Sequence, residues 1–195
     1  MINLSNYSFK ALIFDCDGTI ADTMPLHYLS WVYAFNKNRA RFPFSKQDLM
    51  SMAGVGLHDT IEYLNKKHAE FLDPITVAAD KERYYVEHLE QVGIIPEVGE
   101  VIRDYEGKLP MAVASGSHRE TVIKTLDRIG LTSKFDAIVT QDDVKNGKPA
   151  PDLFLLAAEK MGVEPTDCIV FEDSELGIQA AKTAGMSSVK IESRL

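Results

Sequence analysis

Cysteine and long apolar runs are scarce in this chain of 195 residues. The two cysteines, Cys16 and Cys168, each lie in or beside a short apolar run, the usual setting of a buried free thiol. Such positions indicate no disulfide framework, although the sequence alone does not exclude a single disulfide between the two cysteines. No apolar stretch has the length of a membrane span, and the first residues lack the basic and apolar regions of a secretory signal. We therefore expect a cytoplasmic protein with no membrane partner.

Basic residues are also fewer than acidic ones: the chain has 21 Lys and Arg and 29 Asp and Glu, which give a formal net charge of −8. This balance argues against nucleic acid or an anionic membrane surface as a general partner. The same acidity would repel an anionic small molecule unless a metal ion or a lysine reverses the sign locally. With 45% hydrophobic residues, the chain can bury one core and carry a modest insertion.

The second half of the chain alternates short apolar segments with amphipathic ones. Strands are expected at residues 109–114, 136–139, 168–171 and 188–191. Between them, Ser117 and Glu120 form the pattern of a capping box, and Ser174 can cap a helix that runs to Gly185. With the apolar run at 11–14, this alternation predicts an α/β fold with a doubly wound parallel sheet.

Residues from about 24 to 92 show no strand alternation and are expected to be helical. Helices are predicted at 26–36, 46–52, 59–68 and 76–91. The linkers at 22–25 and 93–96 would place this insert beside the end of the first strand. One interpretation is a lid that closes over a site at that strand end. The other is a helical subdomain that only adds core, and the position of both linkers favours the lid.

The segment Asp15-Cys16-Asp17-Gly18-Thr19 directly follows the apolar run 11–14. A parallel sheet places its chemistry at the carboxyl ends of its strands. Two carboxylates one residue apart can divide a phosphoryl transfer, since one attacks phosphorus while the other donates and later removes a proton. Cys16 lies between them, where two negative charges disfavour a thiolate, so we expect a packing residue.

Two further segments also follow predicted strands. Ser115 and Gly116 come where a helix begins, and a hydroxyl with free N–H groups suits phosphate, although Ser and Gly open many helices. Glu172 and Asp173 follow the strand at 168–171, and paired acids suit a hard cation. Their alternative role is to satisfy the N-terminus of the next helix.

Lys148 lies in the segment Gly147-Lys148-Pro149-Ala150-Pro151, whose prolines stiffen one side of the loop. A rigidly held ammonium group can pair with a phosphate and with a nucleophilic carboxylate. The alternative is a solvated loop lysine, the usual fate of this residue type. Each segment has such an alternative, but the four together, in this order and at strand ends, favour a catalytic site.

These four segments resemble the signature motifs of the haloacid dehalogenase superfamily, and the resemblance covers essentially the whole chain. It is strongest for the β-phosphoglucomutase-like sugar phosphatases, which have a small helical cap. The resemblance implies a Rossmann-like core at residues 1–22 and 96–195 and an all-α cap at 23–95. It also implies Mg²⁺ as cofactor, an aspartyl-phosphate intermediate and a small phosphate ester, such as fructose 1-phosphate or a phosphogluconate, as substrate. A monomer suits a cap that must open freely.

The resemblance assigns roles to residues of this chain. Asp15 would be the nucleophile and Asp17 the general acid and base. Ser115, with the N–H of Gly116, would bind phosphate oxygens, and Lys148 would neutralise charge in the transition state. The metal ligands would be the carboxylates of Asp15 and Asp173, the backbone carbonyl of Asp17, and Glu172 directly or through water.

The cap residues separate the possible activities. Asp17 indicates phosphate-ester chemistry, because dehalogenases of this type lack an aspartate there. A mutase of the β-phosphoglucomutase type has an arginine where this chain has Leu57, so hydrolysis is favoured over phosphosugar mutase activity. A catalytically silent, metabolite-binding relative is the third alternative. His27 and Lys81 are candidate substrate contacts, with hinge packing and a solvated helix face as their alternatives, and His58 is expected on the surface.

Overall fold

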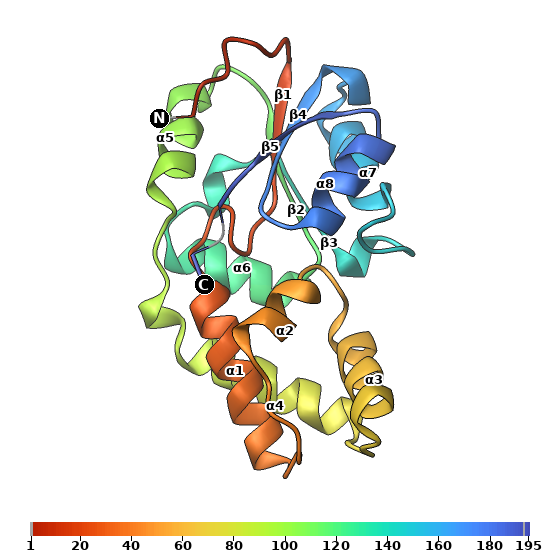
Figure 1. Ribbon diagram of the computed structural model, residues 1–195. Coiled ribbons are helices and arrows are strands. Elements are labelled where there is room, and N and C mark those ends of the chain that lie inside the picture. The colour runs from red at the N-terminus through yellow and green to blue at the C-terminus, as the bar shows by residue number, and fades with distance from the viewer. Residues whose placement is uncertain (1, 193) are drawn as a thin grey trace.

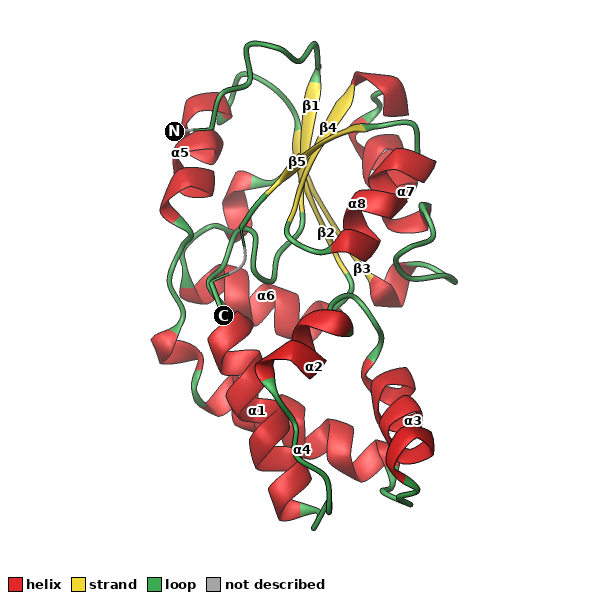
Figure 2. Ribbon diagram, viewed as in Figure 1, coloured by secondary structure: helices red, strands yellow, loops and turns green. Residues whose placement is uncertain are grey.

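The computed structural model describes residues 2–192 and 194–195. Its centre is a parallel sheet of five strands in the order β3-β2-β1-β4-β5 (Figures 1 and 2). The strands are β1 (Ala11–Phe14), β2 (Met111–Ser115), β3 (Ala137–Thr140), β4 (Cys168–Glu172) and β5 (Ser187–Lys190). Every residue of β1, β2 and β4 is buried, which explains the run of four consecutive apolar residues in each. The predicted strands agree with these bounds to within two residues.

Helices cover both faces of the sheet, so the predicted doubly wound α/β fold is confirmed (Figure 1). Helices α5 (Pro96–Tyr105) and α6 (Arg119–Arg128) pack on one face, through residues such as Ile102 and Leu126. Helices α7 (Asp152–Met161) and α8 (Glu175–Thr183) pack on the other face, through residues such as Phe154 and Ala181. One-turn 3₁₀ segments lie at Leu89–Gln91, Thr132–Lys134, Gln141–Asp143 and Pro165–Asp167.

The segment between β1 and α5 is helical, as predicted. It contains α1 (Met24–Lys37), α2 (Lys46–Ser51), α3 (Leu57–His68) and α4 (Pro74–Glu87). These helices lie in the lower half of Figure 1. They share an apolar cluster built around Trp31, Phe35 and Leu64. Within the described residues, no helix combines the length and the apolar character needed to cross a membrane.

The prediction of a helix at 76–91 is wrong at its C-terminal end, because α4 ends at Glu87. The chain then turns at His88 into the 3₁₀ segment Leu89–Gln91. There the side chain of Arg128, from α6, donates hydrogen bonds to the backbone carbonyls of Leu89 at 3.2 Å and Glu90 at 2.6 Å. This tertiary contact supplies the bonding that a continuing helix would otherwise provide.

Helix α4 also makes two polar contacts with α6, one of them buried. The hydroxyl of Tyr85 lies 2.9 Å from that of Thr125, and the hydroxyl of Thr121 donates to Glu82. The helical segment therefore lies against the sheet domain beside the carboxyl end of β1. In this sheet β1 is the central strand, with β2 on one side and β4 on the other, and the strand order reverses there. Such a reversal point is where open α/β sheets form their sites.

Candidate active site

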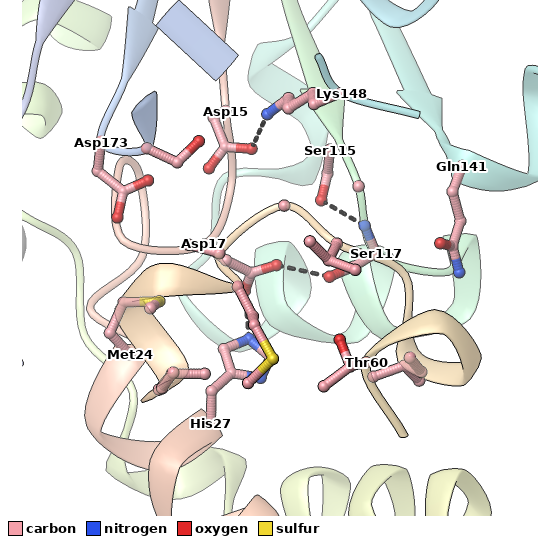
Figure 3. A pocket seen from close by; sticks show the side chains of 18 of the residues that line it. Asp15, Asp17, Met24, His27, Thr60, Ser115, Ser117, Gln141, Lys148 and Asp173 are labelled. Carbon is pink, nitrogen blue, oxygen red and sulfur yellow. Dashed lines mark hydrogen bonds and ion pairs between the residues drawn. The ribbon is translucent and has the colours of Figure 1, made fainter. Parts of the chain in front are cut away.

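Three neighbouring strands deliver the first site residues to one edge of the sheet. Asp15 follows β1, Ser115 is the last residue of β2, and Glu172 is the last residue of β4. The N–H of Asp15 donates to the carbonyl of Phe171 at 2.9 Å, which fixes the loop after β1 against β4. The predicted convergence of the four sequence segments is therefore present, and Figure 3 shows their side chains around one cavity.

A buried cluster of three carboxylates occupies this edge. Carboxylate oxygens of Asp15, Glu172 and Asp173 lie within 4.8 Å of one another, and each residue is at most 6% exposed. The ammonium of Lys148 lies 2.6 Å from Asp15 Oδ1 and 2.6 Å from Glu172 Oε2. Lys148 is thus a buried partner of the acids, and its solvated-loop alternative is wrong.

Burial and mutual repulsion change the titration of this cluster. Loss of hydration, and next the neighbouring charge of Glu172, raise the pKa of Asp15 well above its usual range. The same two causes raise the pKa of Asp173 to about 7. Burial opposes the charge of Lys148, but the carboxylates of Asp15 and Glu172 outweigh it and raise the pKa of this ammonium. These raised pKa values mean that the metal-free cluster tends to keep a proton, because full ionisation would place more negative charge there than one lysine balances.

This arrangement fits a divalent cation. Three carboxylates and one ammonium would leave two uncompensated negative charges if all were ionised, and buried Oδ2 of Asp173 has no hydrogen-bond partner within the described part of the chain. Gly18, at φ +78°, makes room for that oxygen, because a Cβ there would collide with it. Gly177 makes the same room for the carboxylate of Glu172. Oxygen ligands of this kind suit Mg²⁺. The side chain of Asp17 lies outside the cluster.

The carboxylate of Asp17 is held by three side chains instead. Thr23 Oγ1 donates to its Oδ1 at 2.9 Å, His27 Nε2 lies 3.0 Å from the same oxygen, and Ser117 Oγ donates to Oδ2 at 2.7 Å. Burial alone would raise the pKa of Asp17, but these contacts, chiefly that with His27, hold it well below the usual range. Asp17 thus forms a second anionic centre, two residues from Asp15.

The predicted capping box of Ser117 and Glu120 is wrong. Helix α6 begins at Arg119, and its N-cap residue is His118. The carboxylate of Asp142 accepts from the N–H of Arg119 at 2.8 Å and so takes the place of the expected serine. The hydroxyl of Ser117 is free to bind Asp17, while its N–H donates to Ser115 Oγ at 3.1 Å. Its position two residues after Ser115 was the only sequence signal for this role.

The helical segment contributes the opposite wall of the cavity. His27 stacks on Tyr85, with ring centres 4.5 Å apart, while it contacts Asp17. Lys81 also lines the cavity, although it is only 2% exposed, and its ammonium pairs with Glu82 at 2.7 Å. The solvated-face alternative for Lys81 is therefore wrong. Gly116 and Leu57 line the cavity, whereas His58 lines only a neighbouring opening.

Comparisons with known proteins identify the relatives of this chain. A family model described as haloacid dehalogenase-like hydrolase matches residues 12–191. A fructose-1-phosphate phosphatase of Escherichia coli is 39% identical over 184 residues, which are 94% of this chain and 96% of the relative. A β-phosphoglucomutase of Bacillus subtilis is 30% identical, over 93% of this chain and 83% of the mutase. A crystal structure of β-phosphoglucomutase from Clostridium difficile has a TM-score of 0.82 and 30% identity, with 93% of this chain and 84% of that chain covered.

Proposed function

The chain belongs to the haloacid dehalogenase-like hydrolase family, and we propose that it is a magnesium-dependent phosphatase that acts through a phosphoaspartate at Asp15. It is an enzyme of the phosphoric monoester hydrolase class. Named relatives act on phosphorylated sugars, and fructose 1-phosphate, from the name of the Escherichia coli relative, is the first substrate to test. The observation that carries the proposal is the pairing of Asp15 with Lys148 beside two further acids in one buried cluster.

The chemistry follows from the two aspartates. A carboxylate oxygen of Asp15 attacks phosphorus, and the bond from phosphorus to the sugar oxygen breaks. Asp17 gives a proton to that oxygen as it leaves, and then removes a proton from the water that hydrolyses the phosphoaspartate. The proton that Asp17 takes from water in one turnover is the proton that it donates in the next, so Asp17 is the ionised base between the two steps. Hydrolysis restores the Asp15 carboxylate and releases phosphate.

The remaining site residues bind the phosphate and balance its charge. The hydroxyl of Ser115 and the N–H of Gly116 would bind its oxygens, and Lys148 would stabilise the charge that they carry in the transition state. Asp15, Glu172 and Asp173, with the backbone carbonyl of Asp17, would hold Mg²⁺. When bound, the ion neutralises the repulsion between the carboxylate and the phosphate.

Residues 1–22 and 96–195 would form a catalytic core, and residues 23–95 would form a cap. Closure of the cap would exclude water from the reacting phosphate. His27 and Lys81 are the cap residues proposed to act near the substrate. Their contacts with Asp17 and Glu82 support positioning roles in this cavity.

A phosphosugar mutase is the second candidate, because mutases are among the relatives. A mutase must hold a bisphosphate, for which a guanidinium fork is the strongest grip in proteins. Among the described residues that line the cavity there is no arginine, and Leu57 opens α3 at the corresponding position. An apolar leucine at this position favours hydrolysis over phosphosugar mutase activity.

Phosphate release from a panel of phosphate esters, with and without Mg²⁺, tests the proposal. The panel includes fructose 1-phosphate, a phosphogluconate, glucose phosphates and 4-nitrophenyl phosphate, with Asp15→Asn as the inactive control. Magnesium-dependent release that disappears in the control would support the phosphatase. Isomerisation of a glucose phosphate with a bisphosphate primer, in place of release, would support the mutase. Absence of both reactions would contradict the proposal and favour a silent relative.

A further inference from the structure

The three contacts of Asp17 are divided unequally between its two carboxylate oxygens. Among the described residues, Oδ1 is contacted by Thr23 Oγ1 at 2.9 Å and by His27 Nε2 at 3.0 Å, whereas Oδ2 is contacted only by Ser117 Oγ, at 2.7 Å. A carboxylate has about four lone-pair sites, two on each oxygen. The sites of Oδ1 are therefore filled, and Oδ2 keeps one site for a further partner. Oδ2 is the oxygen of Asp17 that remains available for a proton or a substrate atom.

The donors also come from different parts of the fold. Thr23 and His27 belong to the start of α1, where the helical segment begins, whereas Ser117 comes from the loop after β2. That loop is fixed on both sides of the hydroxyl. The N–H of Ser117 donates to Ser115 Oγ at 3.1 Å, and its carbonyl accepts from the N–H of Gln141 at 3.3 Å. Figure 3 shows the resulting chain of contacts from Ser115 through Ser117 to Asp17.

We propose that Ser117 is a positioning residue that directs Oδ2 of Asp17 at the oxygen of the leaving group. This inference rests on the proposed phosphatase function. As the Asp15 oxygen forms its bond to phosphorus, the bond from phosphorus to the sugar oxygen breaks, and the proton on Oδ2 passes to that oxygen. In the second half of the reaction, a water molecule gives a proton back to Oδ2 of Asp17. The oxygen of that water bonds to phosphorus, and the bond between phosphorus and Asp15 breaks.

A hydroxyl is suited to this task because it is a compact hydrogen-bond donor. Its hydrogen occupies one lone-pair site of Oδ2 both when Asp17 is ionised and when it carries a proton, so the acid proton is confined to the other site of Oδ2 and the carboxyl keeps one orientation through both halves. Since Ser115 lies on the same loop, the contact also fixes the acid relative to the proposed phosphate-binding hydroxyl. Removal of the Ser117 hydroxyl would leave Oδ2 free to rotate away from the leaving group.

The test compares two esters that differ in their need for an acid. Fructose 1-phosphate must expel an alkoxide, which needs a proton, whereas 4-nitrophenyl phosphate expels a stable phenolate. Because kcat/KM reports steps only up to formation of the phosphoaspartate, it isolates the proton delivery. Ser117→Ala should lower kcat/KM for fructose 1-phosphate about tenfold or more, as expected for loss of a hydrogen bond to a charged group. The loss for 4-nitrophenyl phosphate should be much smaller.

Two further variants separate positioning from a general structural effect. Ser117→Thr keeps a hydroxyl and should restore most of the activity towards fructose 1-phosphate. Thr60→Val removes a hydroxyl from another wall of the same cavity and should affect both esters alike. Thermal unfolding of each variant confirms that it is folded.

A double-mutant cycle with Asp17→Asn completes the test. If Ser117 acts through Asp17, its substitution should change the ratio of the two kcat/KM values by less than about twofold when Asp17→Asn is already present. Equal losses for the two esters in Ser117→Ala, or an undiminished effect when it is combined with Asp17→Asn, would overturn the positioning role. Absence of magnesium-dependent release from both esters by the parent protein would overturn the proposed function, and this inference with it.

Discussion

The ammonium nitrogen of Lys148 lies 2.6 Å from a carboxylate oxygen of Asp15, although the two residues are 133 positions apart in the chain. Both side chains are buried, and Glu172 shares the same ammonium. The pair is the only ionic link that the described structure shows between the proposed nucleophile and a positive charge. The loop after β3 is therefore part of the site, because it carries Lys148, whose ammonium group balances the carboxylates that follow β1 and end β4.

Replacement of Lys148 by methionine should therefore affect both stability and catalysis. Two buried carboxylates would lose their counter-charge, and such a loss typically costs about 3 kcal/mol or more of unfolding free energy. We expect kcat to fall by roughly 10²-fold or more, as for other removed electrostatic contacts. Denaturant unfolding without metal and steady-state kinetics measure the two effects. Lys145→Met, on the same loop at an exposed position, is the control and should change stability by less than about 0.5 kcal/mol. Equal effects of the two variants would contradict this role of Lys148.

Gly18 should be required for metal binding. At φ +78°, an alanine would be strained by about 1–2 kcal/mol, and its Cβ would also collide with Asp173 Oδ2. Gly18→Ala should therefore lower stability and weaken Mg²⁺ binding, as measured by thermal unfolding in a magnesium titration. Gly107→Ala is the matched control, since Gly107 has φ +69° and open space around it. It should carry the backbone strain alone and leave the response to Mg²⁺ unchanged. A parent-like response in Gly18→Ala would contradict the close approach.

Magnesium should stabilise the protein, and more strongly at pH 8 than at pH 6. The pKa of Asp173 is raised from 3.8 to about 7, chiefly by burial and next by Glu172. Without metal, this group binds its proton more tightly in the folded state, so its contribution to stability falls as the pH rises from about 4 through 7. Mg²⁺ bound by these carboxylates would take the place of that proton and offset the repulsion between them. Differential scanning calorimetry at both pH values, with EDTA or Mg²⁺, measures the effect. A magnesium-induced shift in Tm that is larger at pH 6 would contradict this competition.

Much of this fold and site could be predicted from the sequence, for identifiable reasons. The buried strands β1, β2 and β4 each have four consecutive apolar residues, and acidic residues directly follow two of these runs. Their meeting at one sheet edge follows from the parallel topology. The end of α4 could not be predicted, because it depends on Arg128, which lies 38 and 39 positions beyond the two residues whose carbonyls it binds.

The contact of Ser117 with Asp17 could not be predicted for a similar reason. Its local pattern with Glu120 predicts a capping box, but Asp142 occupies the cap position from a distant segment. Likewise, Lys81 has the sequence environment of a solvated lysine, and only the packing of α1 against α4 buries it beside Glu82 and Tyr85. Local patterns could identify the strands and the acids, while contacts between distant segments decide which side chains reach them.

Leu57 should limit the enzyme to monophosphates. Because Leu57 lines the cavity at the start of α3, Leu57→Arg would add a guanidinium group where a second phosphate could bind. We expect this variant to bind fructose 1,6-bisphosphate more tightly than the parent does, by about tenfold, the gain typical of one good charge-assisted contact. Inhibition of 4-nitrophenyl phosphate hydrolysis by the bisphosphate measures the change. Leu57→Met keeps the apolar character and should behave as the parent. No change in Leu57→Arg would show that this position does not face the distal end of the substrate.

The proposed catalysis depends most directly on the phosphoaspartate at Asp15. Asp17→Asn should still form it from 4-nitrophenyl phosphate, whose leaving group needs no proton, but should hydrolyse it slowly because the base is lost. Rapid mixing of this variant with Mg²⁺ and 4-nitrophenyl phosphate should give a burst of about one 4-nitrophenolate per protein molecule. Acid quenching and borohydride reduction should then yield homoserine at position 15 by mass spectrometry, with none in Asp15→Asn. No burst together with an unmodified Asp15, while the parent enzyme turns over, would contradict covalent catalysis by this residue.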